Sequence, residues 1–218
     1  MSKTGSDSEA FAGYRALADR LHSPTFNDRP DLETAASLSS TVSAARALHA
    51  DQPLLADMYE FELRLDSSAR SEWLEPVPSN MLGVFAEEQW PDLKIEFQPG
   101  LHVIQSRWDL ITMRQALIAE PTSAFLPEIG EAGFWLVLPS RNETRIRSSS
   151  EEEISALRKF EAGERVSEIF ETSDNETEEQ TLEKLNRAVV LISDWCDENI
   201  VVDIGVPVPE NAKFESDG

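Results

Sequence analysis

The sequence predicts a β-hairpin over residues 134–147, FWLVLPSRNETRIR. This hairpin excludes an all-helical fold. Five apolar residues precede Pro139, a polar turn follows, and apolar and basic residues then alternate. A continuous apolar run is typical of a buried strand, and alternation is typical of a strand with one side facing solvent. Because most other periodic stretches are helical, we expect an α+β fold with a small antiparallel sheet.

Residues 10–74 are expected to form an N-terminal helical module, and residues 1–9 and 205–218 to be a flexible terminus and tail. Pro30 and Pro53 mark the starts of the second and third helices, since proline is favoured in the first helical turn. The inward residues expected in the three helices are Phe11, Tyr14, Leu17, Ala18 and Leu21; Leu32, Ala35, Leu38, Val42, Ala45 and Leu48; and Leu54, Leu55, Met58, Phe61 and Leu65.

Residues 75–132 begin with a linker that contains two prolines, EPVPSNM. Leu93–Phe97 and Leu101–Arg107 alternate like short strands, and a Gln-Pro-Gly turn separates them. Asp109 is expected to cap a helix that ends before Pro121.

The hairpin is followed by three overlapping Ser-x-x-Glu pairs, Ser148 to Glu153, which indicate the start of a helix. Gly163 is the expected C-terminal cap of that helix. A short helix around Val166–Phe170, a long helix over about 176–198 and a strand at Ile200–Ile204 are expected after it.

The net charge of −22 limits the function classes that fit this chain. Proteins that bind nucleic acids neutralise phosphates with basic residues, so the charge opposes nucleic-acid binding and binding to anionic membranes. No apolar run approaches the roughly 20 residues that span a bilayer, and we expect a cytoplasmic protein. Solubility or adaptation to salt, and a basic or amphipathic partner, remain the explanations of the acidity.

The sequence contains no recognisable catalytic constellation. The three histidines, His22, His49 and His102, lie far apart without metal-ligand spacing, and neither a phosphate-binding glycine loop nor a nucleophile elbow is present. The single cysteine, Cys196, is more typical of a buried packing residue than of a reactive thiol. We therefore expect a non-catalytic accessory protein with no metal or cofactor of its own.

The order strand, strand, helix, short helix, long helix, strand over residues 133–204 predicts a winged-helix-like domain. Such a domain binds DNA through its later helix, or a peptide by adding a strand to its hairpin. Acidic residues surround the long helix, and only Lys184 and Arg187 offset them. Peptide binding is therefore favoured, and a winged-helix regulator or an acidic DNA-mimic protein is the alternative.

The string from Phe134 to Phe170 resembles the PqqD-like leader-peptide recognition elements of pathways that modify ribosomally synthesised peptides. The matching parts are the apolar strand ending at Leu138-Pro139, the strand Thr144–Arg147 running into a capped helix, and the Gly163 turn before Val166–Ile169. In that family the leader peptide adds as a strand to the edge of the hairpin and packs against the third helix.

A wider resemblance covers about residues 50–204. LADMYEFELRLDSSA (55–69), FQPGLHVIQSRWDLITMRQAL (97–117) and the hairpin resemble the partner subunits of multinuclear non-heme iron oxidative enzymes, the HvfC-like and methanobactin- or 3-thiaglutamate-type partners. The resemblance implies a heterodimer with an iron-dependent TIM-barrel enzyme that modifies a cysteine of a precursor peptide. It also implies that the iron belongs to the partner, while this chain binds the leader.

The candidate site residues are chosen from these resemblances and from the enrichment of tryptophan and arginine at interface centres. The peptide-binding candidates are Thr144, Arg145, Ile146, Arg147, Leu182, Leu185 and Val189, and the enzyme-partner candidates are Arg107, Trp108 and Tyr59, with the helical module contributing to the same interface. Within the hairpin, Thr144 and Ile146 are expected to be buried and the two arginines more exposed. The alternatives are that the arginines only protect a sheet edge from aggregation, that Trp108 is a core residue, and that the chain is a stand-alone enzyme.

Overall fold

The computed structural model describes residues 11–21, 35–120, 130–170 and 178–206. The predicted flexible N-terminus and most of the predicted tail lie outside these residues. The chain divides into two compact units, each built from two separate segments. Unit 1 comprises Met1–Glu72 and Gly100–Ser150, and unit 2 comprises Trp73–Pro99 and Glu151–Gly218.

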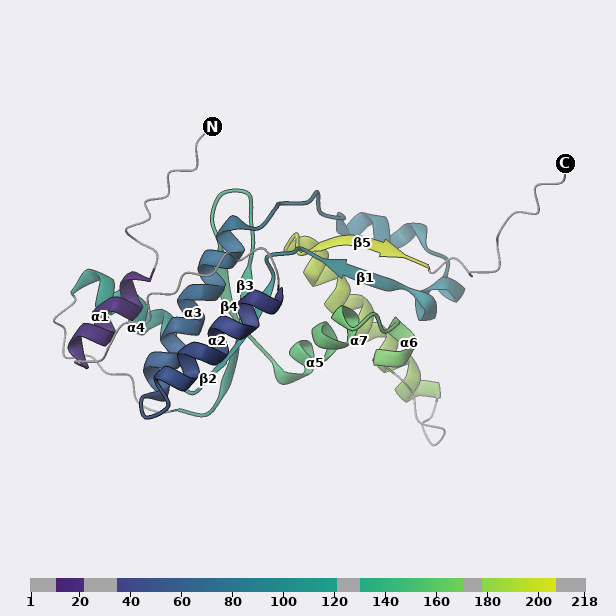
Figure 1. The fold of residues 1–218 in the computed structure, drawn as a ribbon. Coiled ribbons are helices and arrows are strands. Elements are labelled where there is room, and N and C mark those ends of the chain that lie inside the picture. Colours follow the sequence, from purple (N-terminus) through teal and green to yellow (C-terminus); the bar gives the residue numbers. More distant parts are fainter. Residues whose placement is uncertain (1–10, 22–34, 121–129, 171–177, 207–218) are drawn as a thin grey trace, which may run out of the picture. The chain divides into compact units, whose positions relative to one another are not determined.

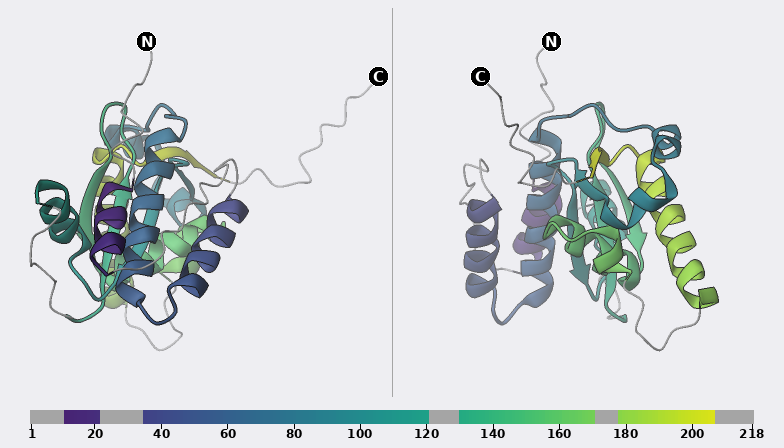
Figure 2. Two further views of the ribbon diagram at one scale, coloured as in Figure 1. Left: turned by 60° about the vertical axis from the view of Figure 1, so that its left-hand side comes forward. Right: turned by 90° about the vertical axis from the view of Figure 1, so that its right-hand side faces the viewer.

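Unit 1 contains four described helices, α1 (Ala12–Arg20), α2 (Ala35–Leu48), α3 (Pro53–Arg70) and α4 (Leu110–Ala119). Helix α3 is central, because α1, α2 and α4 all pack against it (Figure 1). Figure 2 shows α1, α2 and α3 side by side. The cap predicted for α4 is confirmed, since the carboxylate of Asp109 accepts a hydrogen bond from the Thr112 N–H at 3.0 Å.

The apolar side chains that recur at helical spacing along these helices form much of the core of unit 1. Leu54 and Leu65 pack at the margin of this core. The inward prediction is wrong for Leu48, which is 46% exposed at the last turn of α2. The predicted residues that are buried are Phe11, Tyr14, Leu17, Ala18, Leu38, Val42, Ala45, Leu55, Met58 and Phe61.

The sheet of unit 1 has three antiparallel strands in the order β2 (His102–Ser106), β3 (Gly133–Leu138) and β4 (Arg145–Ser149). The predicted hairpin is confirmed as β3 and β4, with Val137 opposite Ile146. Strand β2 pairs with the other side of β3, with Ile104 opposite Trp135.

Unit 2 contains a two-stranded antiparallel sheet together with 3-10 helices and α-helices. Strand β1 pairs with β5, although more than a hundred residues separate them in the sequence. The described elements are the 3-10 helices η1 (Ser79–Val84) and η2 (Glu87–Asp92), the strands β1 (Lys94–Phe97) and β5 (Val201–Gly205), and the helices α5 (Glu151–Glu161), α6 (Val166–Ile169) and α7 (Glu178–Asp197).

Aromatic rings form the centre of unit 2. The ring of Trp195 on α7 meets the rings of Phe97 and Phe160 edge to face, with centroid distances of 5.3 and 5.9 Å. The indole N–H of Trp195 donates to Glu153 Oε1 at 2.8 Å, so α5 and α7 are joined by a buried hydrogen bond. The side-chain amide of Gln98 bonds both backbone groups of Leu74 and thereby fixes the segment that precedes η1.

The α+β fold class is confirmed, whereas the winged-helix-like domain over residues 133–204 is not. Its hairpin belongs to unit 1, while α5, α6, α7 and β5 belong to unit 2. The predicted boundary at the 75–81 linker lies close to the change of unit at Glu72 and Trp73. None of the helices in the described ranges has the length and apolar character needed to cross a membrane.

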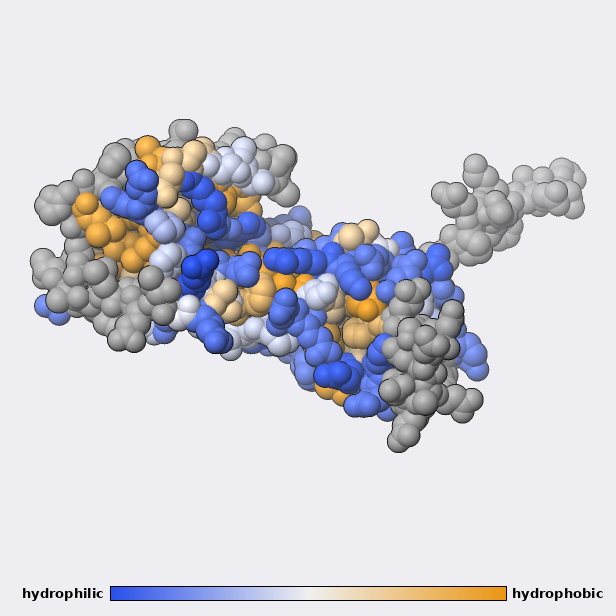
Figure 3. All heavy atoms as spheres, turned by 90° about the horizontal axis from the view of Figure 1, so that it is seen from below, coloured by the Kyte–Doolittle hydropathy of each residue, from blue (hydrophilic) through white to orange (hydrophobic). Residues whose placement is uncertain are grey.

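Most of the surface seen in Figure 3 is hydrophilic, as the high content of charged residues requires. Apolar side chains reach the surface between the hydrophilic ones at several places.

Candidate functional site

One face of the three-stranded sheet packs onto the helices of unit 1. Ile104 and Val137 on this face are buried in the core, and Trp135 and Ile146 pack against it. The four residues share a face because paired residues, and residues two apart along a strand, point the same way. Ile146 therefore anchors β4 to the core, as the hairpin pattern predicted.

Two polar contacts join the same face of the sheet to α3. His102 Nε2 lies 3.1 Å from Ser67 Oγ, and Ser106 Oγ donates to Asp57 Oδ2 at 3.3 Å. Burial lowers the pKa of His102 to about 4, and the nearby positive charge of Arg64 acts in the same direction. His102 is therefore neutral at pH 7 and supports the structure.

The carboxyl of Asp57 is part of a charged network on α3. Burial raises its pKa, and the guanidinium of Arg46 together with the Ser106 hydroxyl offsets part of that rise. The Arg46 Nη2 lies 3.3 Å from Asp57 Oδ1 and 2.7 Å from Glu60 Oε2. The network ties α2 and the sheet to α3.

A second buried carboxylate, Glu62, holds α1 and α4 against α3. Its Oε1 accepts from the Gly13 N–H and from Arg114 Nε, both at 3.0 Å. Burial raises the pKa of Glu62, and Arg114 opposes the rise. The sequence analysis missed this residue, although it lies four positions after Met58 and seven after Leu55. An acidic residue on an apolar helix stripe is the signal that could have identified it.

The indole N–H of Trp135 is a polar group without a partner in the part of the chain that the structure describes. Its Nε1 atom is buried and has no hydrogen-bond acceptor there. Leaving a buried donor unpaired costs about 1–3 kcal/mol. Trp135 lies opposite Ser148 on β4, so this donor belongs to the strand next to the sheet edge.

Strand β4 is a terminal strand of the sheet, since it pairs with β3 and no second described strand pairs with it. Arg145 is exposed on the face opposite Ile146, and Thr144 and Arg147 are half-buried. The structure therefore places Arg145, Ile146 and Arg147 on one edge strand, and Thr144 directly precedes it. The expected contrast between the two faces holds for Arg145 but not for Arg147, which is half-buried like Thr144 and Ile146.

The other three peptide-binding candidates lie on α7, which belongs to unit 2 and not to the unit that contains β4. Val189 is 37% exposed. Leu182 and Leu185 are helical, and their side chains lie outside the described part of the structure.

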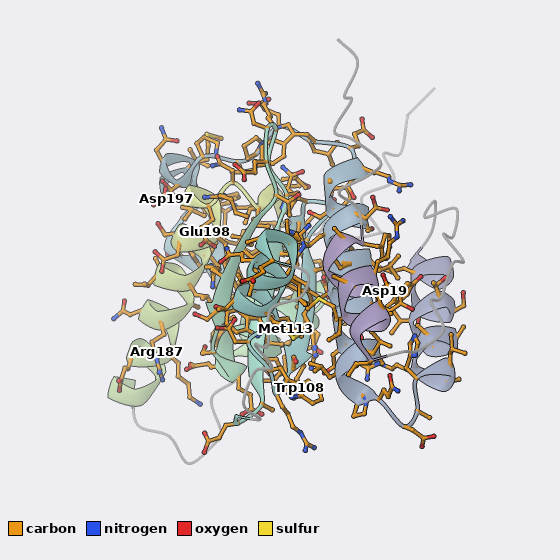
Figure 4. All side chains as sticks on the ribbon, turned by 90° about the vertical axis from the view of Figure 1, so that its left-hand side faces the viewer. Asp19, Trp108, Met113, Arg187, Asp197 and Glu198 are labelled. Carbon is orange, nitrogen blue, oxygen red and sulfur yellow. The ribbon has the colours of Figure 1, made fainter. Side chains whose placement is uncertain are left out.

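The three enzyme-partner candidates have different environments. Arg107 is exposed, and Trp108 is half-buried against the core of unit 1. Figure 4 shows Trp108 just ahead of α4, the helix that contains Met113. The prediction is wrong for Tyr59, which is 1% exposed and packs on the rings of Phe11 and Tyr14, so its side chain is not available at a surface.

The predicted buried role of Cys196 is confirmed. The thiol is buried on α7, and burial raises its pKa to about 11, so it is protonated at pH 7. Among the described residues, no three histidine, cysteine or acidic side chains are grouped so that they could hold a metal ion.

The chain was compared with protein-family profiles, curated proteins and solved structures, and none of the three comparisons gives a significant match.

Proposed function

We propose that this protein is a non-catalytic accessory subunit that binds the leader of a ribosomally synthesised precursor peptide along β4. In this proposal it presents a cysteine of the peptide to an iron-dependent oxidative enzyme in the cytoplasm. The iron and the oxidative chemistry belong to the partner enzyme, and the product is of the 3-thiaglutamate or methanobactin type.

The observation that carries the proposal is the position of β4. A terminal strand has one side along which an extended peptide can form backbone hydrogen bonds. Ile146 fixes β4 to the core of unit 1, so the strand is held in place before a peptide arrives. Preorganisation of this kind lowers the entropic cost of binding.

The test is a proline substitution in the edge strand. Ile146→Pro removes a backbone donor and disturbs the strand, whereas Ile146→Val keeps the backbone and most of the side chain. Calorimetry with the precursor peptide encoded beside this gene is expected to show nearly complete loss of affinity for the proline variant and little change for the valine variant. Circular dichroism establishes that both variants are folded, and unchanged binding by a folded proline variant refutes edge docking.

The heterodimer is tested separately. Co-expression with the neighbouring iron-dependent enzyme, followed by size-exclusion chromatography, is expected to give a stable complex. A chain that elutes alone in the presence of its partner contradicts this part of the proposal.

A further inference from the structure

The negative charge of the chain is concentrated in unit 2. This unit holds 24 of the 41 acidic residues and 7 of the 19 basic ones, a net charge of −17, which leaves −5 for unit 1. Solubility alone requires no such asymmetry, because a spread of both signs keeps a surface soluble. A one-sided field attracts a partner of opposite charge and steers its approach.

Exposed apolar side chains are concentrated in the same unit. Unit 2 contains six of the eight exposed large apolar side chains found among the described residues, and unit 1 contains Leu48 and Ile118. Those with the greatest exposure are Val84 on η1, at 63%, and Val190 on α7, at 60%. The 3-10 helix η1 packs against α7, so the two elements that carry these valines are neighbours.

Val190 lies in an acidic stripe of α7. Glu183, Asp194 and Asp197 are exposed and lie seven residues before, four after and seven after Val190. Residues at these spacings share one face of a helix. Arg187, three residues before Val190, is exposed on the same face, and its Nη2 pairs with Glu152 Oε2 at 3.2 Å. Beyond this ion pair, the exposed face of α7 presents Val190 with carboxylates on both sides along the axis.

The C-terminal end of α7 strengthens this negative field. The carbonyl groups at a helix C-terminus carry partial negative charge, which basic side chains usually offset. The last turn of α7 contains no basic residue. Figure 4 shows Asp197 and Glu198 at this end of the helix.

We propose that the exposed faces of α7 and η1 bind a basic amphipathic helix of a partner protein. The apolar side of that helix covers Val84 and Val190, and its lysine or arginine side chains pair with the carboxylates of α7. Burial of the apolar surface supplies affinity, and the charges select the partner and orient it. This surface lies in unit 2 and is distinct from the β4 edge.

The test uses the full chain and a synthetic amphipathic helix with leucines on one face and lysines on the other. A peptide with the same leucines and glutamates in place of lysines is the charge control. Fluorescence anisotropy near physiological salt is expected to show binding of the lysine peptide alone. Val84→Asn and Val190→Asn are each expected to weaken it about tenfold, and Asp194→Asn to weaken it less, with an effect that disappears at high salt.

Ile118→Asn is the matched control, because Ile118 is 43% exposed and lies on α4 of unit 1. It is expected to bind the lysine peptide as the original chain does. The proposal is overturned if the lysine peptide does not bind, if both peptides bind equally, or if the valine variants bind no more weakly than Ile118→Asn. None of these outcomes depends on binding at β4, so this proposal and the peptide-binding proposal fail independently.

Discussion

Protonation of His102 is expected to destabilise unit 1 when the pH falls below neutrality. The imidazole lies between β2 and α3, close to Arg64, and burial lowers its pKa from 6.5 to about 4. The unfolded chain therefore binds a proton between these values that the folded chain does not bind. Stability contributed by the neutral imidazole is complete above pH 6.5 and is lost as the pH falls toward 4.

The size of the effect follows from the two pKa values. The full difference corresponds to about 3 kcal/mol in the free energy of unfolding, and about 2 kcal/mol of it is lost between about pH 7.5 and about pH 5. His102→Gln is the matched variant, because the glutamine Nε2 can take the place of the imidazole Nε2 near Ser67 Oγ and does not titrate. Between these two pH values, the free energy of unfolding of the variant is expected to fall by about 2 kcal/mol less than that of the original chain.

The measurement is urea-induced unfolding at both pH values, followed by hydrogen-exchange mass spectrometry on peptides of unit 1. Peptides are needed because a chain with two units need not unfold in one step. His49, whose pKa burial also lowers, is present in both proteins, so its contribution cancels in the comparison. If the original chain and His102→Gln lose the same free energy between the two pH values, the buried-histidine argument is refuted.

Substitutions at three further positions test contacts inside the individual units, with stability measured by urea unfolding. Gly13→Ala is expected to cost about 1–2 kcal/mol despite the better helix propensity of alanine, because the new Cβ would lie 2.7 Å from Glu62 Oε1. Glu153→Ala is expected to cost about 2–3 kcal/mol by leaving the Trp195 N–H unpaired, and Glu153→Gln to cost less, since it keeps an acceptor. Asp109→Ala is expected to cost about 1 kcal/mol through loss of the α4 cap, and Asp109→Asn to be nearly neutral.

Apart from the 3-10 helices η1 and η2, which the sequence analysis did not predict, the elements of this fold were predictable from local patterns. Apolar spacing identified the helices, the Asp109 cap and Gly163 fixed two of their ends, and the buried-then-alternating pattern identified β3 and β4. Gly163 has the positive φ of 84° that a glycine cap adopts. Local signals succeed here because periodicity and capping depend on residues only a few positions apart.

Strand pairing beyond the hairpin was not predictable. Strand β1 pairs with β5 and β2 pairs with β3. A short alternating segment predicts a strand, but it does not specify which distant segment of the chain that strand pairs with. For the same reason the sequence did not reveal the contacts of Glu62 with Gly13 and Arg114 or the contact of His102 with Ser67. The two residues in each contact are 35 to 52 positions apart in the sequence. Tyr59 was predicted at an interface although it lies four residues after Leu55, at a helical spacing that places both side chains toward the core.

The division of the chain explains why the hairpin and the long helix were assigned to one domain. The chain passes from unit 1 to unit 2 between Ser150 and Glu151. These residues belong to the serine and glutamate run that also starts α5, so no proline-rich or glycine-rich linker marks the boundary in the sequence. Neighbours in the sequence were therefore taken as neighbours in one domain. The unit that contains β4 has a net charge of −5 and the unit that contains α7 has −17, so the total of −22 is unevenly divided between the units that hold the two proposed binding surfaces. In the two proposals, the partner of α7 is basic because it pairs with carboxylates, whereas backbone hydrogen bonds hold the peptide at β4 and set no requirement on its charge.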